Sequence, residues 1–137
     1  MKVFFDTSAF VKRYVDEPNS DRVIEICQQA DRLILSIICL PEMISTLNRL
    51  LRENTISADN YRRTKGLILS DLNDSDVCIL SPEVIRRTLI CLENNAIGAM
   101  DALHIGCALT VNPDLFVSSD RRQITAAQQE GLKVMEV

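Results

Sequence analysis

Four short apolar runs without polar alternation limit the fold of this chain more than any other feature. They lie at residues 3–5, 33–35, 77–80 and 115–117, and a weaker run lies at 133–135. A strand with one face in water alternates polar and apolar residues, whereas a strand buried on both faces is apolar throughout. Amphipathic stretches at helical spacing separate these runs. The sequence therefore predicts an α/β fold with a mostly parallel sheet covered by helices on both faces.

Capping residues mark where several of the helices should begin. The caps that we expect are Thr7 or Ser8, Asn19 or Ser20, Ser57, and Ser81 followed by Pro82. Further helices are expected at residues 40–52, 99–110 and 121–130. Strand and helix therefore alternate along the whole chain.

The length of 137 residues suits one domain, which we expect to span residues 1–137. No window of about 18 uncharged apolar residues predicts a membrane span, and Asp6 comes too early for a secretory signal. The five cysteines are scattered and form no CxxC pair. They are expected to be small, reduced core residues of a cytoplasmic protein.

Acidic residues stand where strands end or apolar helices begin. Asp6 follows the first apolar run directly, and Asp120 closely follows the run at 115–117. If these strands are neighbours, both carboxylates lie at one edge of the sheet, where ligands of such sheets bind. Asp101 lies in the first turn of a strongly apolar helix, and Glu42 opens another.

Each acid taken alone has a simpler interpretation, because the first turn of a helix favours acids as caps and through the helix dipole. Asp101 fits that interpretation least, since a lone carboxylate among apolar residues is costly. Together the four form an oxygen-only ligand set that suits Mg²⁺ or Mn²⁺. Zinc is disfavoured, since His104 is the single histidine and the cysteines have no ligand spacing. An acidic cation cluster is typical of nuclease chemistry.

Four segments together resemble the PIN domain, and within it the VapC-type toxins of prokaryotic toxin–antitoxin systems. These segments are Phe5-Asp6-Thr7-Ser8-Ala9, Glu42, Asp101-Ala102-Leu103-His104 and Ser118-Ser119-Asp120. The resemblance covers nearly the whole chain and shows no departure at the four acids. It implies a three-layer α/β/α sandwich with a five-stranded sheet. It also implies a metal-dependent endoribonuclease that hydrolyses phosphodiester bonds of single-stranded RNA and arrests growth unless a cognate antitoxin restrains it.

The resemblance also implies a role for each site residue. Asp6, Asp101 and Asp120 would hold Mg²⁺ or Mn²⁺, and Glu42 would complete the catalytic site, directly or through water, and orient the attacking water. Ser118 would bond a carboxylate, and Thr7 or Ser8 would contact Asp6. His104 shares a helix face with Asp101, and both a supporting role and plain packing remain open for it.

The net charge of −4, from 15 basic and 19 acidic residues, argues only weakly against a nucleic-acid substrate. With four acids assigned to a cation site, the rest of the chain balances at 15 against 15. Lys12, Arg13, Arg121 and Arg122 are candidates for contacts to RNA phosphates, although each is equally compatible with a solvated surface. The apolar side of the helices at 40–72 could pack in a homodimer, bind an antitoxin or form ordinary core.

Three other functions fit the sequence less well. A phosphatase of the haloacid-dehalogenase type needs a second acid two residues after Asp6, where Ser8 stands. A receiver domain needs an acid after the third strand, where Ser81 stands. A catalytically silent PIN module acting as an RNA- or protein-binding scaffold usually lacks one of the acids, and all four are present.

Overall fold

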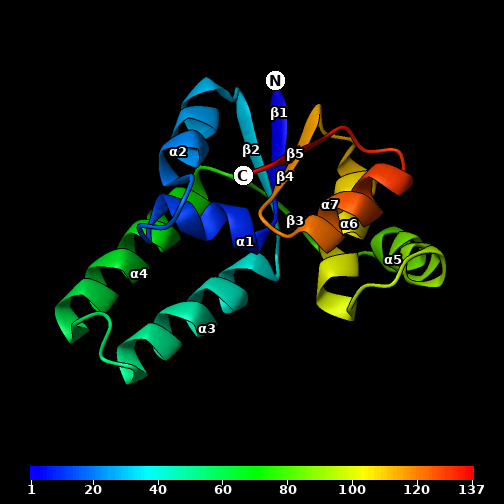
Figure 1. Ribbon diagram of the computed structural model, residues 1–137. Helices are drawn as coiled ribbons and strands as arrows, with labels where there is room; N and C mark the ends of the chain where they lie inside the picture. The colour runs from blue at the N-terminus through cyan, green and yellow to red at the C-terminus, as the bar shows by residue number, and fades with distance from the viewer.

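The computed structural model describes all 137 residues, and its centre is one parallel sheet of five strands (Figure 1). The strands are β1 (Lys2–Phe5), β2 (Arg32–Ser36), β3 (Asp76–Cys78), β4 (Leu115–Ser118) and β5 (Val134–Glu136). Their order across the sheet is β3-β2-β1-β4-β5, and all four pairings are parallel. The predicted α/β fold is confirmed, with a sheet that is fully rather than mostly parallel.

Seven α-helices and one 3₁₀ turn cover the two faces of this sheet. They are α1 (Thr7–Phe10), η1 (Val11–Arg13), α2 (Ser20–Gln29), α3 (Cys39–Arg52), α4 (Ala58–Asn73), α5 (Pro82–Asn94), α6 (Ala99–Val111) and α7 (Arg121–Gln129). The helices α1 to α4 pack on one face and α5 to α7 on the other, as the two apolar clusters and Figure 1 show. This is the expected three-layer sandwich. None of the helices combines the length and the apolar composition that crossing a membrane requires.

The unbroken apolar runs are explained by burial on both sides of the sheet. Val3 and Phe5 belong to the cluster under α1 to α4, whereas Phe4 belongs to the cluster under α5 to α7. Successive side chains of a strand point to opposite faces, so each residue of β1 needs an apolar side chain. Phe4 stacks on Phe116 of the neighbouring β4, with ring centroids 5.6 Å apart.

Two details differ from the sequence prediction. The first helix is capped by Asp6 rather than by Thr7 or Ser8, because the Asp6 backbone is extended and its carboxylate accepts from Ala9 N. The third strand ends at Cys78 instead of continuing to residue 80. Ile79 and Leu80 are exposed beyond the end of this edge strand. The caps Ser57 and Ser81 are confirmed by their bonds to Asn60 N and Val84 N.

The neighbouring strands β1 and β4 create the place for a site. Phe5 is opposite Val117 in the register, and Asp6 N donates to Val117 O at 3.0 Å. The chain builds the sheet outward from β1 in one direction through β2 and β3, and in the other through β4 and β5. The carboxyl ends of β1 and β4 therefore flank the switch point, where ligands of parallel sheets bind.

Candidate active site

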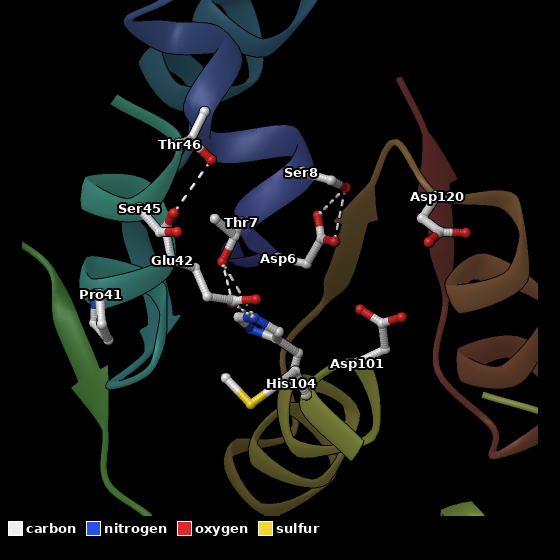
Figure 2. A pocket seen from close by; sticks show the side chains of 11 residues that line it. Asp6, Thr7, Ser8, Pro41, Glu42, Ser45, Thr46, Asp101, His104 and Asp120 are labelled. Carbon is white, nitrogen blue, oxygen red and sulfur yellow. Dashed lines mark hydrogen bonds and ion pairs between the residues drawn. The ribbon is translucent and has the colours of Figure 1, made fainter. Parts of the chain in front are cut away.

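A cavity of about 510 Å³ lies at this edge of the sheet. All four predicted acids line it, each from a different segment: Asp6 after β1, Glu42 on α3, Asp101 on α6 and Asp120 after β4. Figure 2 shows these carboxylates around the cavity, with Thr7, Ser8 and His104 beside them. No lysine or arginine is among the lining residues. The cavity is therefore strongly negative.

Asp6 is the most buried of the four acids, with 3% of its surface exposed. Ser8 Oγ lies 2.9 Å and 2.7 Å from its two carboxylate oxygens, and Ala9 N donates to Oδ1 at 3.0 Å. Burial raises the pKa of Asp6 above its ordinary value, against the opposing effects of His104 and these hydrogen bonds. Ser8, rather than Thr7, is the residue that contacts Asp6.

Asp120 has two roles at the start of α7. Its Oδ1 accepts from the backbone N–H of Arg122 at 2.8 Å and of Gln123 at 3.4 Å, so it caps the helix. It also lines the cavity, and its other oxygen accepts no hydrogen bond within the protein. The simple capping interpretation and the functional one are therefore compatible for this residue.

The side chains of Ser118 and Gln123 hold the turn between β4 and α7 in place. Ser118 is fully buried. Its Oγ accepts a hydrogen bond from Asp120 N at 3.0 Å and donates one to Gln123 Oε1 at 3.2 Å. It connects to Asp6 through the Ser8 hydroxyl, 3.3 Å away. Gln123 is also fully buried, and its Nε2 donates to Asp101 O at 3.2 Å. Sequence reasoning missed Gln123, although its place three residues after the capping Asp120 matches the spacing of a capping box.

Asp101 is the acid with the fewest compensating contacts. Its carboxylate is half-buried and accepts no hydrogen bond, since only its backbone oxygen is bonded. Burial, and then the charge of Asp120, raise the pKa of Asp101 above its ordinary value. An unpaired, partly buried carboxylate beside other acids is destabilising unless a cation neutralises it.

Glu42 is held by two neighbours through one oxygen. Its Oε1 lies 2.7 Å from Thr7 Oγ1 and 2.6 Å from His104 Nε2. Burial opposes the charged form, but the bonds from His104 and Thr7 prevail and hold the pKa of Glu42 below its ordinary value. Oε2 accepts no hydrogen bond and is left for a ligand. His104 is packed, with 1% of its surface exposed, and its side chain contacts Glu42 from this buried position.

The donor set fits a hard divalent cation in its chemistry, because it consists of carboxylate oxygens with hydroxyls beside them. As they stand, no three Asp, Glu, His or Cys side chains are spaced to ligate one ion together. Asp101 has no bond to break before it turns, and one oxygen of Asp120 is also free. Asp6, Asp101 and Asp120 are the residues that would hold the ion, with water at the remaining positions.

The four basic candidates separate into two pairs. Lys12 is buried, and its Nζ donates to Val137 O at 3.0 Å, so the expectation that it contacts RNA is corrected. Arg13 pairs with Asp71 at 3.3 Å and lies over the Tyr14 ring, and it does not line the cavity. Arg121 and Arg122 are exposed at the start of α7, directly beyond Asp120.

Comparison with known families agrees with this fold. The PIN domain family model matches residues 3–129. The chain belongs to the PIN domain family. Among curated proteins, none matches the sequence of this chain.

Solved structures share the fold of this PIN domain at low sequence identity. FitAcB from Neisseria gonorrhoeae matches with a TM-score of 0.73 and 14% identity, covering 98% of this chain and 96% of that one. VapC20 from Mycobacterium tuberculosis, described as a sarcin-ricin loop cleaving toxin, matches with a TM-score of 0.71 and 14% identity over 98% of both chains. VapBC2 from Rickettsia felis, bound to a promoter DNA fragment, matches with a TM-score of 0.71 and 13% identity over 100% of this chain and 99% of that one.

Proposed function

We propose that the protein is a metal-dependent endoribonuclease that hydrolyses phosphodiester bonds of single-stranded RNA and serves as the toxin of a toxin–antitoxin pair. One observation carries the proposal: four carboxylates from four separate segments line a single cavity that no lysine or arginine lines. Such an arrangement costs stability and is offset by a bound cation. Membership in the PIN domain family and the fold shared with VapC20 support the same conclusion.

The chain's own residues suggest how the reaction proceeds. Asp6, Asp101 and Asp120 would hold Mg²⁺ or Mn²⁺, which when bound lowers the pKa of coordinated water and offsets charge on the phosphate. Thr7 and His104 fix Glu42 Oε1, which leaves Oε2 to accept a hydrogen bond from the attacking water and orient it. Water attacks phosphorus in line, the bond to the 3′ oxygen breaks, and that oxygen gains a proton. The products carry 5′-phosphate and 3′-hydroxyl ends.

The proposed partners are a cognate antitoxin and a second copy of the chain in the cytoplasm. Structures with the same fold include a toxin–antitoxin complex from Klebsiella pneumoniae. Met43, Leu47 and Ile68 on α3 and α4 are buried as ordinary core, but Leu67 and Leu69 on α4 remain exposed. Ile79 beside β3 and Leu89 on α5 are exposed as well. Light scattering on the purified protein would measure whether it forms the homodimer.

The deciding experiment is a cleavage assay on labelled single-stranded RNA. We expect cleavage with Mg²⁺ or Mn²⁺, none in EDTA, and none for Asp6→Asn or Asp101→Asn. Activity that survives both substitutions, or that is indifferent to EDTA, would contradict the proposal. An in-cell map of cleaved RNA ends would then identify the target.

The open spacing of the acids favours one alternative, a catalytically silent PIN module that binds RNA or protein as a scaffold. This alternative predicts RNA binding without cleavage under any divalent metal. It also predicts that Mg²⁺ and Mn²⁺ leave the thermal stability unchanged, whereas a metal-holding site is stabilised by its ion.

A further inference from the structure

A second hollow, of about 400 Å³, is lined in part by Arg121 and Arg122, which directly follow Asp120 of the active-site cavity. One wall is the face of α7 that carries Arg121, Arg122, Thr125 and Gln129. The other wall is the connection between α5 and α6, which contributes Asn95 and Ile97. We call this hollow the α7 groove. It is not among the acids of the active site, and none of its lining residues is acidic.

Both walls of the α7 groove are close in the chain to acids of the active site. The wall that contains Ile97 continues along the chain into Asp101, and the wall formed by α7 begins directly after Asp120. Gln123 Nε2 donates to Asp101 O at 3.2 Å and holds the two walls together at that end. Figure 2 shows Asp101 and Asp120 on the same side of the cavity. The far end is bridged by a bond of 3.4 Å from Asn94 Nδ2 to Glu130 Oε1.

The charge of the groove is opposite to that of the active site. Arg121 has one weak partner, Glu136 at 3.5 Å, and its side chain remains 84% exposed. Arg122 has no acidic partner. Two guanidinium groups therefore stand free at the end nearest the acids, while amide, hydroxyl and apolar side chains line the rest. Guanidinium groups favour phosphates, and amides with apolar surface suit the edge and face of a base.

We propose that the α7 groove binds the nucleotide next to the scissile phosphate of a single-stranded RNA. This inference rests on the proposed ribonuclease function and assigns it a substrate-binding site. The wall from residue 121 to 129 is about 12 Å long at 1.5 Å per residue. The volume of the groove falls within the range of small-ligand pockets, about 300–1,000 Å³. A strand whose scissile phosphate lies among the acids has its next phosphate at Arg121 and Arg122.

RNA is favoured over an acidic peptide by the position of the groove. An acidic peptide bound by the two arginines would not need a groove beside the acids. An RNA strand that leaves the active site does need a positive group there, because its next phosphate is charged. The acids repel phosphate without their cation, so the positive groove also supplies attraction that the cavity itself lacks.

Binding can be measured without cleavage. Fluorescence anisotropy of a labelled single-stranded oligoribonucleotide in EDTA reports affinity for the wild type, for Arg121→Ala/Arg122→Ala, and for the matched control Arg86→Ala/Arg87→Ala. The control removes two adjacent arginines of α5 that pair with Glu83 outside the groove. We expect the groove variant to bind about tenfold more weakly and its salt slope to fall by about 0.7, the contribution of one neutralised phosphate on a single strand. The control should match the wild type.

Cleavage kinetics provide the second measurement. In Mg²⁺, the groove variant should show a raised KM for oligonucleotides long enough to enter the groove, a kcat within about twofold of the wild type, and an unchanged KM for the shortest cleavable substrate. Equal loss of affinity in the control variant would show a bulk charge effect and overturn the proposal. Unchanged RNA binding by the groove variant would also overturn it, whatever that variant does to a protein partner.

The two proposals fail in different ways. Groove-dependent RNA binding by a protein that cleaves nothing in Mg²⁺ or Mn²⁺ would retain the groove and refute the ribonuclease. Metal-dependent cleavage with identical kinetics in the wild type and the groove variant would retain the ribonuclease and refute the groove.

Discussion

His104 Nε2 lies 2.6 Å from Glu42 Oε1, although the two residues are 62 positions apart in the chain. The histidine is buried, and its Nδ1 has no hydrogen-bond partner. A buried N–H without a partner costs more than a bare acceptor nitrogen in the same place, so the proton belongs on Nε2, where it is donated to Glu42. The imidazole therefore orients the carboxylate through Nε2, and Glu42 keeps its second oxygen for the reaction.

The first prediction concerns this orientation. His104→Ala should lower kcat about 10- to 100-fold, the usual loss when a residue that orients a site carboxylate is removed. His104→Gln keeps an N–H at the position of Nε2 and should recover part of the activity. The assay is steady-state RNA cleavage in saturating Mg²⁺, with thermal unfolding of each variant beside it. Equal activity for the alanine and glutamine variants at equal stability would mean that the histidine only fills space.

The second prediction sets stability against function at Asp101. Its carboxylate is half-buried, unbonded and near Asp120, so Asp101→Asn should raise the melting temperature of the metal-free protein while abolishing cleavage. In a chain of this size about 1 kcal/mol corresponds to roughly 3–5 °C. Asp16→Asn, at an exposed position away from the cavity, is the matched control and should change neither property. A lower melting temperature for Asp101→Asn would show that the acid is stabilised by contacts that were not recognised.

The third prediction concerns how the difference in thermal stability between Asp101→Asn and the wild type depends on pH. Because the folded protein raises the pKa of Asp101 above its ordinary value of 3.8, the folded state holds its proton longer than the unfolded state. This proton contributes stability at low pH, and the contribution is lost as pH rises through the folded pKa. In EDTA the advantage of Asp101→Asn should therefore be small near pH 3.5 and grow toward pH 7. Thermal unfolding across this range measures it, and a gap that is constant with pH would contradict the account.

The fold and the four acids were accessible from sequence for a local reason. Burial on both faces makes β1 and β4 continuously apolar, and the carboxyl ends of parallel strands must meet at one edge. Asp6 and Asp120 follow those two ends, so their approach required only that the strands be neighbours. Asp101 was marked by its apolar surroundings, since a charge in such a place needs a partner.

The contacts that sequence could not supply depend on elements brought together by the whole fold. The bond between His104 and Glu42 needs α6 and α3 to meet over the sheet edge from opposite layers. Lys12 has the sequence character of a surface cation. Because β5 pairs with β4, however, the end of the chain returns to Lys12, and Val137 O accepts a hydrogen bond from its Nζ. No local sequence pattern predicts either of these two contacts.

The fourth prediction concerns the cysteines, all five of which are free thiols. Burial raises the pKa of Cys39 and of Cys107 to about 12, and that of Cys91 to about 11. Only the thiolate is nucleophilic, so these three should resist iodoacetamide at pH 8 in the folded protein and react after unfolding in guanidinium. Peptide mass spectrometry locates the labelled positions. Fast labelling of Cys39 or Cys107 in the folded state would show local opening of the core.

The fifth prediction compares two glycines in helices. A Cβ at Gly106 on α6 would lie 2.2 Å from Thr88 Oγ1 and 2.9 Å from Val84 O on α5, so the two helices pack as closely as they do because this residue has no side chain. A Cβ at Gly66 on α4 would meet nothing within 4 Å. Gly106→Ala should cost about 1–3 kcal/mol in the free energy of unfolding because it forces the helices apart. Gly66→Ala should add about 0.5–1 kcal/mol, since alanine restricts the unfolded chain and favours the helix. Urea unfolding gives both values, and a stabilising Gly106→Ala would mean that α5 moves without resistance.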